Sequence, residues 1–163
     1  MIKKNRGFTL IELLIVIAII GVLSSIVLAS LNSARIKARD VRRIADLRNL
    51  KTALEVYYND NNNVYPTSLN DLVTSGQISV VPVDILGNTP YSYAYYPATN
   101  PTTYHLGASL EQSNDALNND KDCDSTTGNN CIEAAAYTNG FNGADSSKCN
   151  TADVGLFCYD VVP

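Results

Sequence analysis

The pattern of apolar and polar residues divides the chain into one long helix and a more polar remainder. Between Phe8 and Leu31, 24 residues carry a single charge, that of Glu12. A helix of this length spans about 36 Å, enough to cross the roughly 30 Å hydrocarbon core of a bilayer. Apolar residues then recur every three or four positions, as on one face of an amphipathic helix. These positions are Val41, Ile44, Leu47, Leu50, Leu54, Tyr57 and Tyr58. We therefore predict one helix from Phe8 to Asn59, with Arg43 on its polar face.

The remainder is predicted to form a small globular head over residues 64–163. Ser68–Val73 is expected to be a short helix. Tyr91–Tyr96 alternates with a period of two, which is typical of a strand, and Thr103–Glu111 is its expected antiparallel partner. Leu156–Val161 is expected to be a last short strand. The predicted fold class is α+β: a long N-terminal helix packed on a small antiparallel sheet, with a disulfide-stapled C-terminal loop region.

All four cysteines lie in the last 41 residues, at Cys123, Cys131, Cys149 and Cys158. An even number in a loop-rich region beyond a membrane segment indicates disulfides formed in an oxidising compartment. Metal-thiolate sites need cysteines in closer pairs, which this sequence lacks. Of the three pairings that four cysteines allow, we favour the local one, Cys123–Cys131 with Cys149–Cys158, although spacing leaves the connectivity open.

The basic leader before the apolar block admits several interpretations. A cleaved secretory signal would have an apolar region of about 7–15 residues, shorter than this one. An ordinary membrane anchor would be hard to orient, because basic residues flank both ends of the block. Residues 4–12, Lys-Asn-Arg-Gly-Phe-Thr-Leu-Ile-Glu, closely resemble the N-terminal signature of type IV prepilins and type II secretion pseudopilins. Tyr65–Thr67 and Gly87–Tyr93 are similar to the major pseudopilin pattern.

This resemblance implies a role for each part of the helix. Residues 1–7 would be a leader that a prepilin peptidase removes between Gly7 and Phe8, leaving Phe8 as the N-methylated terminus. Phe8, Thr9 and Glu12 would act in assembly, with Glu12 pairing with the terminal amine of a neighbouring subunit. A carboxylate in an apolar segment costs roughly 3 kcal/mol, so a partner is expected on physical grounds too. Residues 8–31 would cross the membrane and later form the filament core, and residues 32–63 would be the amphipathic half.

The implied function is that of a structural subunit of a type IV pilus-like filament with the pilin fold. The alternatives are a major pseudopilin of a type II secretion or DNA-uptake pseudopilus, and a monomeric membrane-anchored binding module. The expected partners are further copies, the prepilin peptidase, the membrane, and an assembly platform with its ATPase, since this chain has no phosphate-binding Gly-Lys-Ser/Thr loop. The precursor is expected in the cytoplasmic (inner) membrane with its head outside the cytoplasm, and later in a surface filament or pseudopilus. Many family members have a proline in the apolar block; here Gly21 is the only weak point at which the helix could melt.

The C-terminal region contains a candidate cation site. Asp120, Asp122 and Asp124 alternate as in loops that bind hard cations. The loop is not an EF-hand, because serine and cysteine stand where glycine and glutamate would be needed. Major pseudopilins bind calcium with a C-terminal acidic loop, so the resemblance implies calcium as the candidate cofactor, with Asp145 as a further ligand. A solvated polar loop without metal is the alternative.

Charge and histidine content argue against other functions. Seven of the 12 basic residues lie between Arg35 and Lys51, whereas from Asp60 onward 12 acids face two lysines. Nucleic acid is therefore not an expected partner of the head. The basic stretch is expected to contact acidic heads of neighbouring subunits, with lipid headgroups or nucleic acid as alternatives. His105, the only histidine, is expected to pack or to be exposed, and no enzymatic arrangement is evident.

Overall fold

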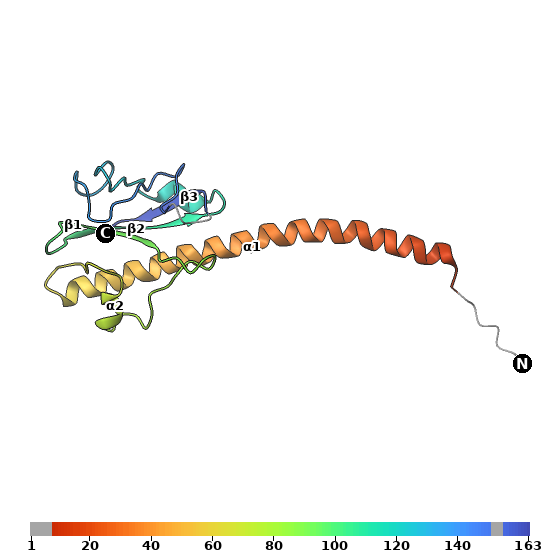
Figure 1. Cartoon of the computed structure of the whole chain (residues 1–163), viewed down its shortest axis with the longest axis horizontal. Helices are drawn as coiled ribbons and strands as arrows, with labels where there is room; N and C mark the ends of the chain where they lie inside the picture. The colour runs from red at the N-terminus through yellow and green to blue at the C-terminus, as the bar shows by residue number, and fades with distance from the viewer. Residues whose placement is uncertain (1–7, 151–154) are drawn as a thin grey trace, which may run out of the picture. The chain divides into compact units, whose positions relative to one another are not determined.

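The structure is a computed structural model that describes residues 8–150 and 155–163, so the predicted leader at 1–7 lies outside the described residues (Figure 1). Its elements are α1 (Leu10–Asp60), α2 (Asp71–Thr74), β1 (Ser92–Tyr96), β2 (Thr103–Leu110), the 3₁₀ helix η1 (Asp115–Asn119) and β3 (Phe157–Val161). This arrangement confirms the predicted α+β fold of a long N-terminal helix, a small antiparallel sheet and a disulfide-containing C-terminal region. The chain divides into two compact units, of which the first ends at Ile36 and the second covers Lys37–Pro163.

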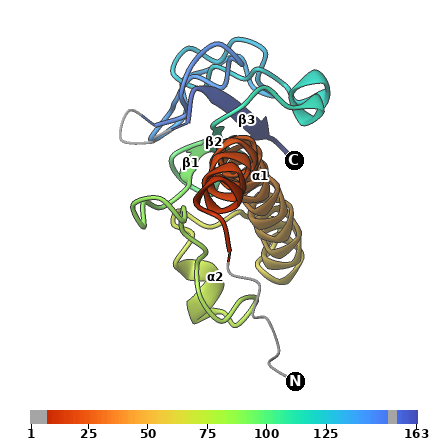
Figure 2. The same ribbon diagram turned by 90° about the vertical axis from the view of Figure 1, so that its right-hand side faces the viewer.

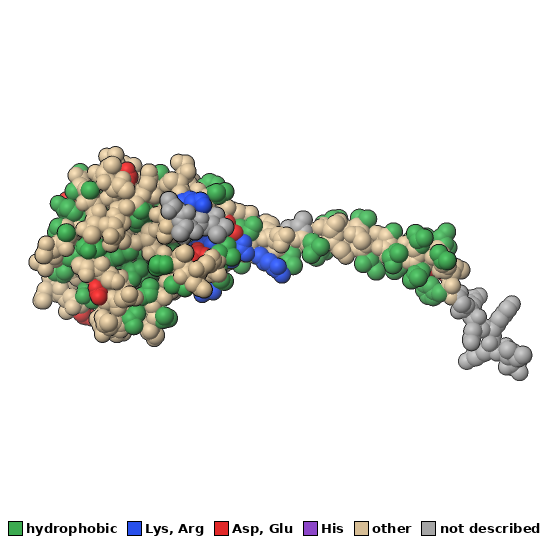
Figure 3. All heavy atoms as spheres, viewed as in Figure 1, with side chains coloured by type: hydrophobic (Ala, Val, Ile, Leu, Met, Phe, Trp, Pro, Cys, Tyr) green, Lys and Arg blue, Asp and Glu red, His purple; other side chains and the backbone are tan. Residues whose placement is uncertain are grey.

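The first unit consists of the apolar part of α1. All described side chains from Phe8 to Leu28 are exposed, including those of Ile17 and Leu23. Figure 3 shows hydrophobic side chains along the surface of this part of the helix. An 18-residue window of α1 has a mean hydropathy of 2.8, so by length and composition the helix is able to cross a membrane. The helix is continuous through Gly21 in this single chain, and loosening there in the filament stays a prediction. Such an exposed apolar surface needs lipid or other protein around it.

The second unit, the head, forms around the rest of α1, with the sheet on one side of the helix and α2 on the other (Figures 1 and 2). The predicted apolar face is buried at four of its positions: Ile44, Leu47, Leu50 and Leu54. Val41 was assigned to the same face, but its side chain is 61% exposed. The placement of Arg43 on the polar face was wrong, because the residue is 1% exposed. It contacts Asp40 on α1 itself and two carboxylates from other parts of the head, Asp84 and Glu111.

The sheet has the order β1-β2-β3 with both pairs antiparallel. β1 pairs with β2 in the register Tyr96↔Thr103, and β2 pairs with β3 in the register Leu110↔Phe157. Every residue of β2 is buried, because this central strand is covered on both faces. Its even-numbered residues pack toward α1 in the main core, and the odd-numbered residues face the C-terminal loops.

β2 runs alongside α1 and defines two ends of the head. At one end the Tyr104 hydroxyl donates to Glu55 Oε1 at 3.3 Å, and at the other the Glu111 backbone N–H donates to Asp40 Oδ1 at 2.9 Å. The 15 residues of helix and the seven residues of strand between these contacts both span about 22 Å. We call the end at Glu55 the distal end and the end at Asp40 the proximal end.

The C-terminal loops are tied together by two disulfides, Cys123–Cys131 and Cys149–Cys158, the local pairing favoured from the sequence. These loops lie so close to β2 that Gly107 has no room for a side chain. A Cβ at this position would come within 2.6 Å of Phe141 Cε2 and 2.8 Å of Cys149 Sγ. Both distances are shorter than real carbon contacts allow.

Candidate functional site

The start of α1 is organised by Thr9 and Glu12. The backbone N–H and the hydroxyl of Thr9 both donate to Glu12 Oε2, at 2.9 and 2.6 Å, and the N–H of Glu12 donates to Thr9 Oγ1 at 3.3 Å. This reciprocal arrangement is a capping box, which satisfies two N–H groups at a helix start. Glu12 Oε1 has no hydrogen-bond partner among the described residues. The carboxylate is therefore oriented by its own chain with one oxygen still available.

The two residues of the proposed cleavage bond differ in what the structure describes. Phe8 precedes the helix and is 82% exposed, whereas Gly7 lies outside the described residues. Phe8 and Glu12 are one helical turn apart, so the terminus produced by cleavage would lie near the carboxylate. The geometry is compatible with the assembly role that the resemblance implies.

A buried ionic cluster, which the sequence analysis did not anticipate, joins α1 to the proximal end of the head. Arg43 Nη1 donates to Asp40 Oδ1 and to Glu111 Oε1, both at 2.8 Å. The same guanidinium makes a two-pronged contact with Asp84, through Nε to Oδ2 and through Nη2 to Oδ1 at 3.0 Å. Arg39 adds a second two-pronged contact with Glu111, at 2.7 and 2.6 Å.

The pKa values in this cluster follow from these contacts. Burial alone would lower the pKa of Arg43, but hydrogen bonds from its guanidinium to Asp84 and Glu111 raise it overall. The pKa of Asp84 would be raised by burial, yet its hydrogen bonds with Arg43 hold it below the usual value. The hydrogen bond from Arg39 lowers the pKa of Glu111 against the opposing effect of burial. All of these groups are therefore charged at neutral pH.

The basic stretch of α1 is thus partly used inside its own head. Besides Arg39 and Arg43, Lys51 Nζ donates to the carbonyl of Val162 at 2.7 Å, and Arg42 lies 3.8 Å from Asp46. Three of the seven basic residues have neither a carboxylate partner nor another side-chain hydrogen bond among the residues that the structure describes. These are Arg35, Lys37 and Arg48. Contact with other molecules remains open to these three.

The acidic residues proposed for calcium are brought together only in part. Carboxylate oxygens of Asp120, Asp122 and Asp145 all lie within 4.8 Å of one another. Asp124 is not in this group: its Oδ1 accepts from the Thr126 backbone N–H at 3.0 Å, and its Oδ2 accepts from the Thr127 hydroxyl at 2.8 Å. Its inclusion in the ligand set is therefore corrected, because these turn contacts occupy its carboxylate.

The remaining three carboxylates fit a hard cation. Asp120 Oδ1 and Asp145 Oδ1 are buried and have no hydrogen-bond partner in the described part of the head, which is costly for a polar atom. Burial and then repulsion from Asp160 raise the pKa of Asp120 to about 7, and burial and Asp122 raise the pKa of Asp145. A divalent cation would supply the missing partner and offset the repulsion.

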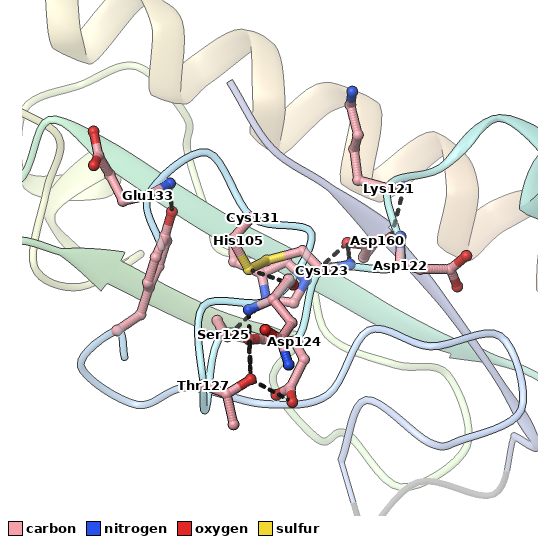
Figure 4. Close-up of a disulfide and its surroundings, with 12 residues drawn as sticks. His105, Lys121, Asp122, Cys123, Asp124, Ser125, Thr127, Cys131, Glu133 and Asp160 are labelled. Atoms are coloured by element: carbon pink, nitrogen blue, oxygen red, sulfur yellow. Dashed lines mark hydrogen bonds and ion pairs between the residues drawn. A yellow bond between two sulfur atoms is a disulfide. The ribbon is translucent and has the colours of Figure 1, made fainter. Parts of the chain in front are cut away.

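His105 is buried at the centre of the loop side of the sheet (Figure 4). Its Nδ1 lies 2.7 Å from Ser125 Oγ, its Nε2 lies 2.9 Å from Asp160 Oδ2, and its ring stacks on Phe141 at 3.8 Å. Although these are the residue types of a hydrolase triad, the three side chains are fully buried and Ser125 Oγ also bonds both backbone groups of Phe141. The arrangement holds the C-terminal loops against the sheet. Of the two alternatives expected for His105, packing and exposure, the structure confirms packing.

Asp160 has a second role in this loop region. Its carboxylate accepts the backbone N–H groups of three consecutive residues, Lys121, Asp122 and Cys123, at 3.0 to 3.2 Å. The chain around the acidic group is therefore held in place by a buried carboxylate. No sequence motif identified this residue as a structural centre.

Comparison with known proteins adds to this description. Residues 2–28 match the profile of a family described as Prokaryotic N-terminal methylation motif. Type II secretion system core protein G of Escherichia coli (strain K12) is 39% identical over 79 residues, which cover 48% of this chain and 54% of that protein. Core protein G of Vibrio cholerae is 36% identical over 106 residues, covering 56% and 71%. Type IV wide pilus major component PilA4 of Thermus thermophilus is 40% identical over 74 residues, covering 45% and 56%.

The chain spans about half the length of the Escherichia coli relative, and no solved structure matches it. The match to the Vibrio cholerae protein nevertheless extends over more than two thirds of that protein. Together with the methylation motif and the fold, this match confirms the resemblance seen in residues 4–12. The chain belongs to the family of type II secretion core protein G subunits and type IV pilins.

Proposed function

We propose that the chain is a structural subunit of a type IV pilus-like filament. It is made as a precursor in the cytoplasmic membrane with its head outside the cytoplasm. A prepilin peptidase cuts between Gly7 and Phe8, and an assembly platform with its ATPase moves the subunit into the filament. The chain itself acts structurally and not as an enzyme.

One observation carries this proposal: the exposed apolar part of α1 begins with a carboxylate, that of Glu12, one of whose oxygens has no partner among the described residues. In the filament, burial of these helices against one another replaces lipid contact and supplies the packing energy. Glu12 would accept the amine of Phe8 from a neighbouring copy. The capping box formed by Thr9 holds the carboxylate in the orientation that this contact needs.

The test is to sequence the N-terminus of the mature protein and to image sheared filaments. We expect a methylated Phe8 at the terminus. Glu12→Gln should be processed normally but should give filaments at about one tenth of the normal yield or less, because an amine without its countercharge is costly to bury. Leu13→Met is the matched control and should assemble normally. A mature terminus other than Phe8, or normal assembly of Glu12→Gln, would contradict the proposal.

A major pseudopilin of a type II secretion system is the second candidate, favoured by the relatives named core protein G. The two candidates differ in where the filament lies. Deletion of the chain would abolish secretion of exoproteins in one case and surface filaments in the other. Immunogold labelling of intact cells with antibody to the head would separate these outcomes.

We also propose that Asp120, Asp122 and Asp145 bind calcium in the head. Calcium at 100 times its dissociation constant would stabilise the head by about 2.7 kcal/mol, which corresponds to a rise in melting temperature of several degrees. Asp145→Asn should remove this rise, and Asp124→Asn should retain it because Asp124 lies outside the group. An equal rise with magnesium, or no rise with calcium, would refute the proposal.

A further inference from the structure

A groove lies at the proximal end of the head, between α1 and η1, with a volume of about 560 Å³. Val41, Ala45 and Arg48 line it from one face of α1, at the spacing that places side chains above one another. Val41 is 61% exposed, and Ala45 and Arg48 are exposed too. Arg48 has no carboxylate partner among the described residues. The groove thus combines an apolar floor with an unpaired cation.

A complementary surface lies at the distal end of the same head. Ile132 and Glu133 follow the disulfide cysteine Cys131, and both side chains are exposed, Ile132 by 51%. The Glu133 carboxylate has no partner within the described part of the chain, and Figure 4 shows it pointing away from the disulfide. Its backbone N–H donates to the Tyr137 hydroxyl at 3.3 Å, which fixes the base of this loop.

The two surfaces cannot meet within one molecule. The loop is held at the distal end, where Tyr137 stacks on Tyr96 of β1 at 5.7 Å. The groove lies on the α1 side of the sheet, between residues 41–49 of α1 and η1, which follows the other end of β2. The loop covers the opposite face of the sheet, with Tyr137 against Ala94. A contact between them therefore needs two molecules. Because it would join different surfaces of identical chains, each added copy would present a free surface for the next, as the open helical arrangement of a filament requires.

We infer that Ile132 and Glu133 of one copy dock into the proximal groove of the next copy, with Glu133 paired to Arg48. Ile132 covers the apolar floor at Val41 and Ala45. This contact between heads rests on the proposed filament function and specifies surfaces that the N-terminal helix does not provide. Charge complementarity selects the occupant, because an exposed carboxylate beside an apolar side chain matches an exposed guanidinium beside an apolar floor.

Asp115 also lines the groove and has the same charge as Glu133. It would oppose the docked carboxylate, so its removal should strengthen the contact between copies. Asp115→Asn should therefore raise the salt concentration at which filaments dissociate. A lower salt concentration would mean that Asp115, and not Arg48, pairs with the neighbouring copy.

Charge reversal in the full chain tests the pairing. Arg48→Glu and Glu133→Arg should each lower the fraction of subunits that remain in sheared filaments at moderate salt by about threefold to fivefold. Combining both substitutions should restore this fraction, because the pair is re-formed with its charges exchanged. Lys37→Glu, which reverses an exposed cation of α1 outside the groove, is the matched control and should change it little.

Crosslinking tests the contact directly. A chain carrying Ala45→Cys and Ile132→Cys should give a ladder of multimers with a short bismaleimide, since each copy presents both partners. Ile132→Cys combined with Val80→Cys should give no ladder, although Val80 is 73% exposed. Melting curves of each variant would show that the head is folded.

The outcomes separate this inference from the proposed function. If the unaltered chain forms no filaments, the proposed function fails and this contact fails with it. If filaments form but the double reversal does not recover and no ladder appears, only this inference is overturned. Loss with Arg48→Glu without rescue by Glu133→Arg would assign the groove to another anionic partner, such as lipid headgroups, and would equally reject docking by Glu133.

Discussion

The substitution Arg43→Met should destabilise the head more than any change at an exposed residue. The guanidinium is 1% exposed and is shared by Asp40, Asp84 and Glu111. Methionine fills a similar volume but leaves these carboxylates without their cation. Removing one partner from a buried ionic group typically costs about 3–5 kcal/mol. A domain of this size is stable by only about 5–15 kcal/mol, so the loss would be a large share of the total.

Urea unfolding of the full chain in detergent, followed by the signal of its ten tyrosines, would measure this loss. Arg42→Met is the matched control: its side chain is 57% exposed and 3.8 Å from Asp46, so the expected loss is below about 1 kcal/mol. Adding Asp84→Asn to Arg43→Met should recover part of the stability, because it removes one of the buried carboxylates that has lost its cation. A loss below about 1 kcal/mol for Arg43→Met would refute the reasoning.

Three further predictions concern pH, a disulfide and a close contact. Because the pKa values of Asp84 and Glu111 are lowered on folding, their contribution is present above their unfolded values near pH 4 and is lost as the pH falls below them. The free energy of unfolding, measured at a series of pH values below neutral, should show this loss. Arg43→Met should show a smaller loss, because the carboxylates no longer have their cation. Replacing Cys149 and Cys158 by serine should cost about 2.7 kcal/mol for a loop of this size, measured by urea unfolding against the unaltered chain, and no loss would contradict a closed bridge. Gly107→Ala should cost about 1–3 kcal/mol or prevent folding, since its Cβ would overlap a neighbouring ring; an unchanged melting temperature would mean that the loops move freely.

The elements of the fold were predictable because their signals are local. The three-to-four residue spacing along α1 and the alternation of the strands depend only on neighbouring positions. The predicted strands at Tyr91–Tyr96 and Thr103–Glu111 differ from β1 and β2 by one residue each. The burial of β2 on both faces was not predictable in the same way, because it depends on how the C-terminal loops return over the sheet.

In the candidate sites, too, features set by neighbouring residues were predictable and features set by the folded surroundings were not. Thr9 and Glu12 are three residues apart, so both the motif and its capping box are visible in the sequence. Alternation placed Asp124 with the other acids, but its turn contacts with neighbouring hydroxyl residues decided its orientation. The error at Arg43 has a similar cause, because two of its carboxylate partners are 41 and 68 residues away along the chain. A helical periodicity does not indicate which polar residue will find buried partners.

The ionic cluster and the groove are physically connected. Asp40 accepts the backbone N–H groups of Glu111 and Gln112, at 2.9 and 3.1 Å, just before the chain enters η1 and forms one wall of the groove. The cluster therefore fixes the start of that wall as well as the join between helix and sheet. If Arg43→Met releases these contacts, filament contacts through the groove should weaken even though no groove residue is changed. Reduced crosslinking between Ala45→Cys and Ile132→Cys in this background, with the head still folded at low temperature, would show that the cluster positions the surface used between copies.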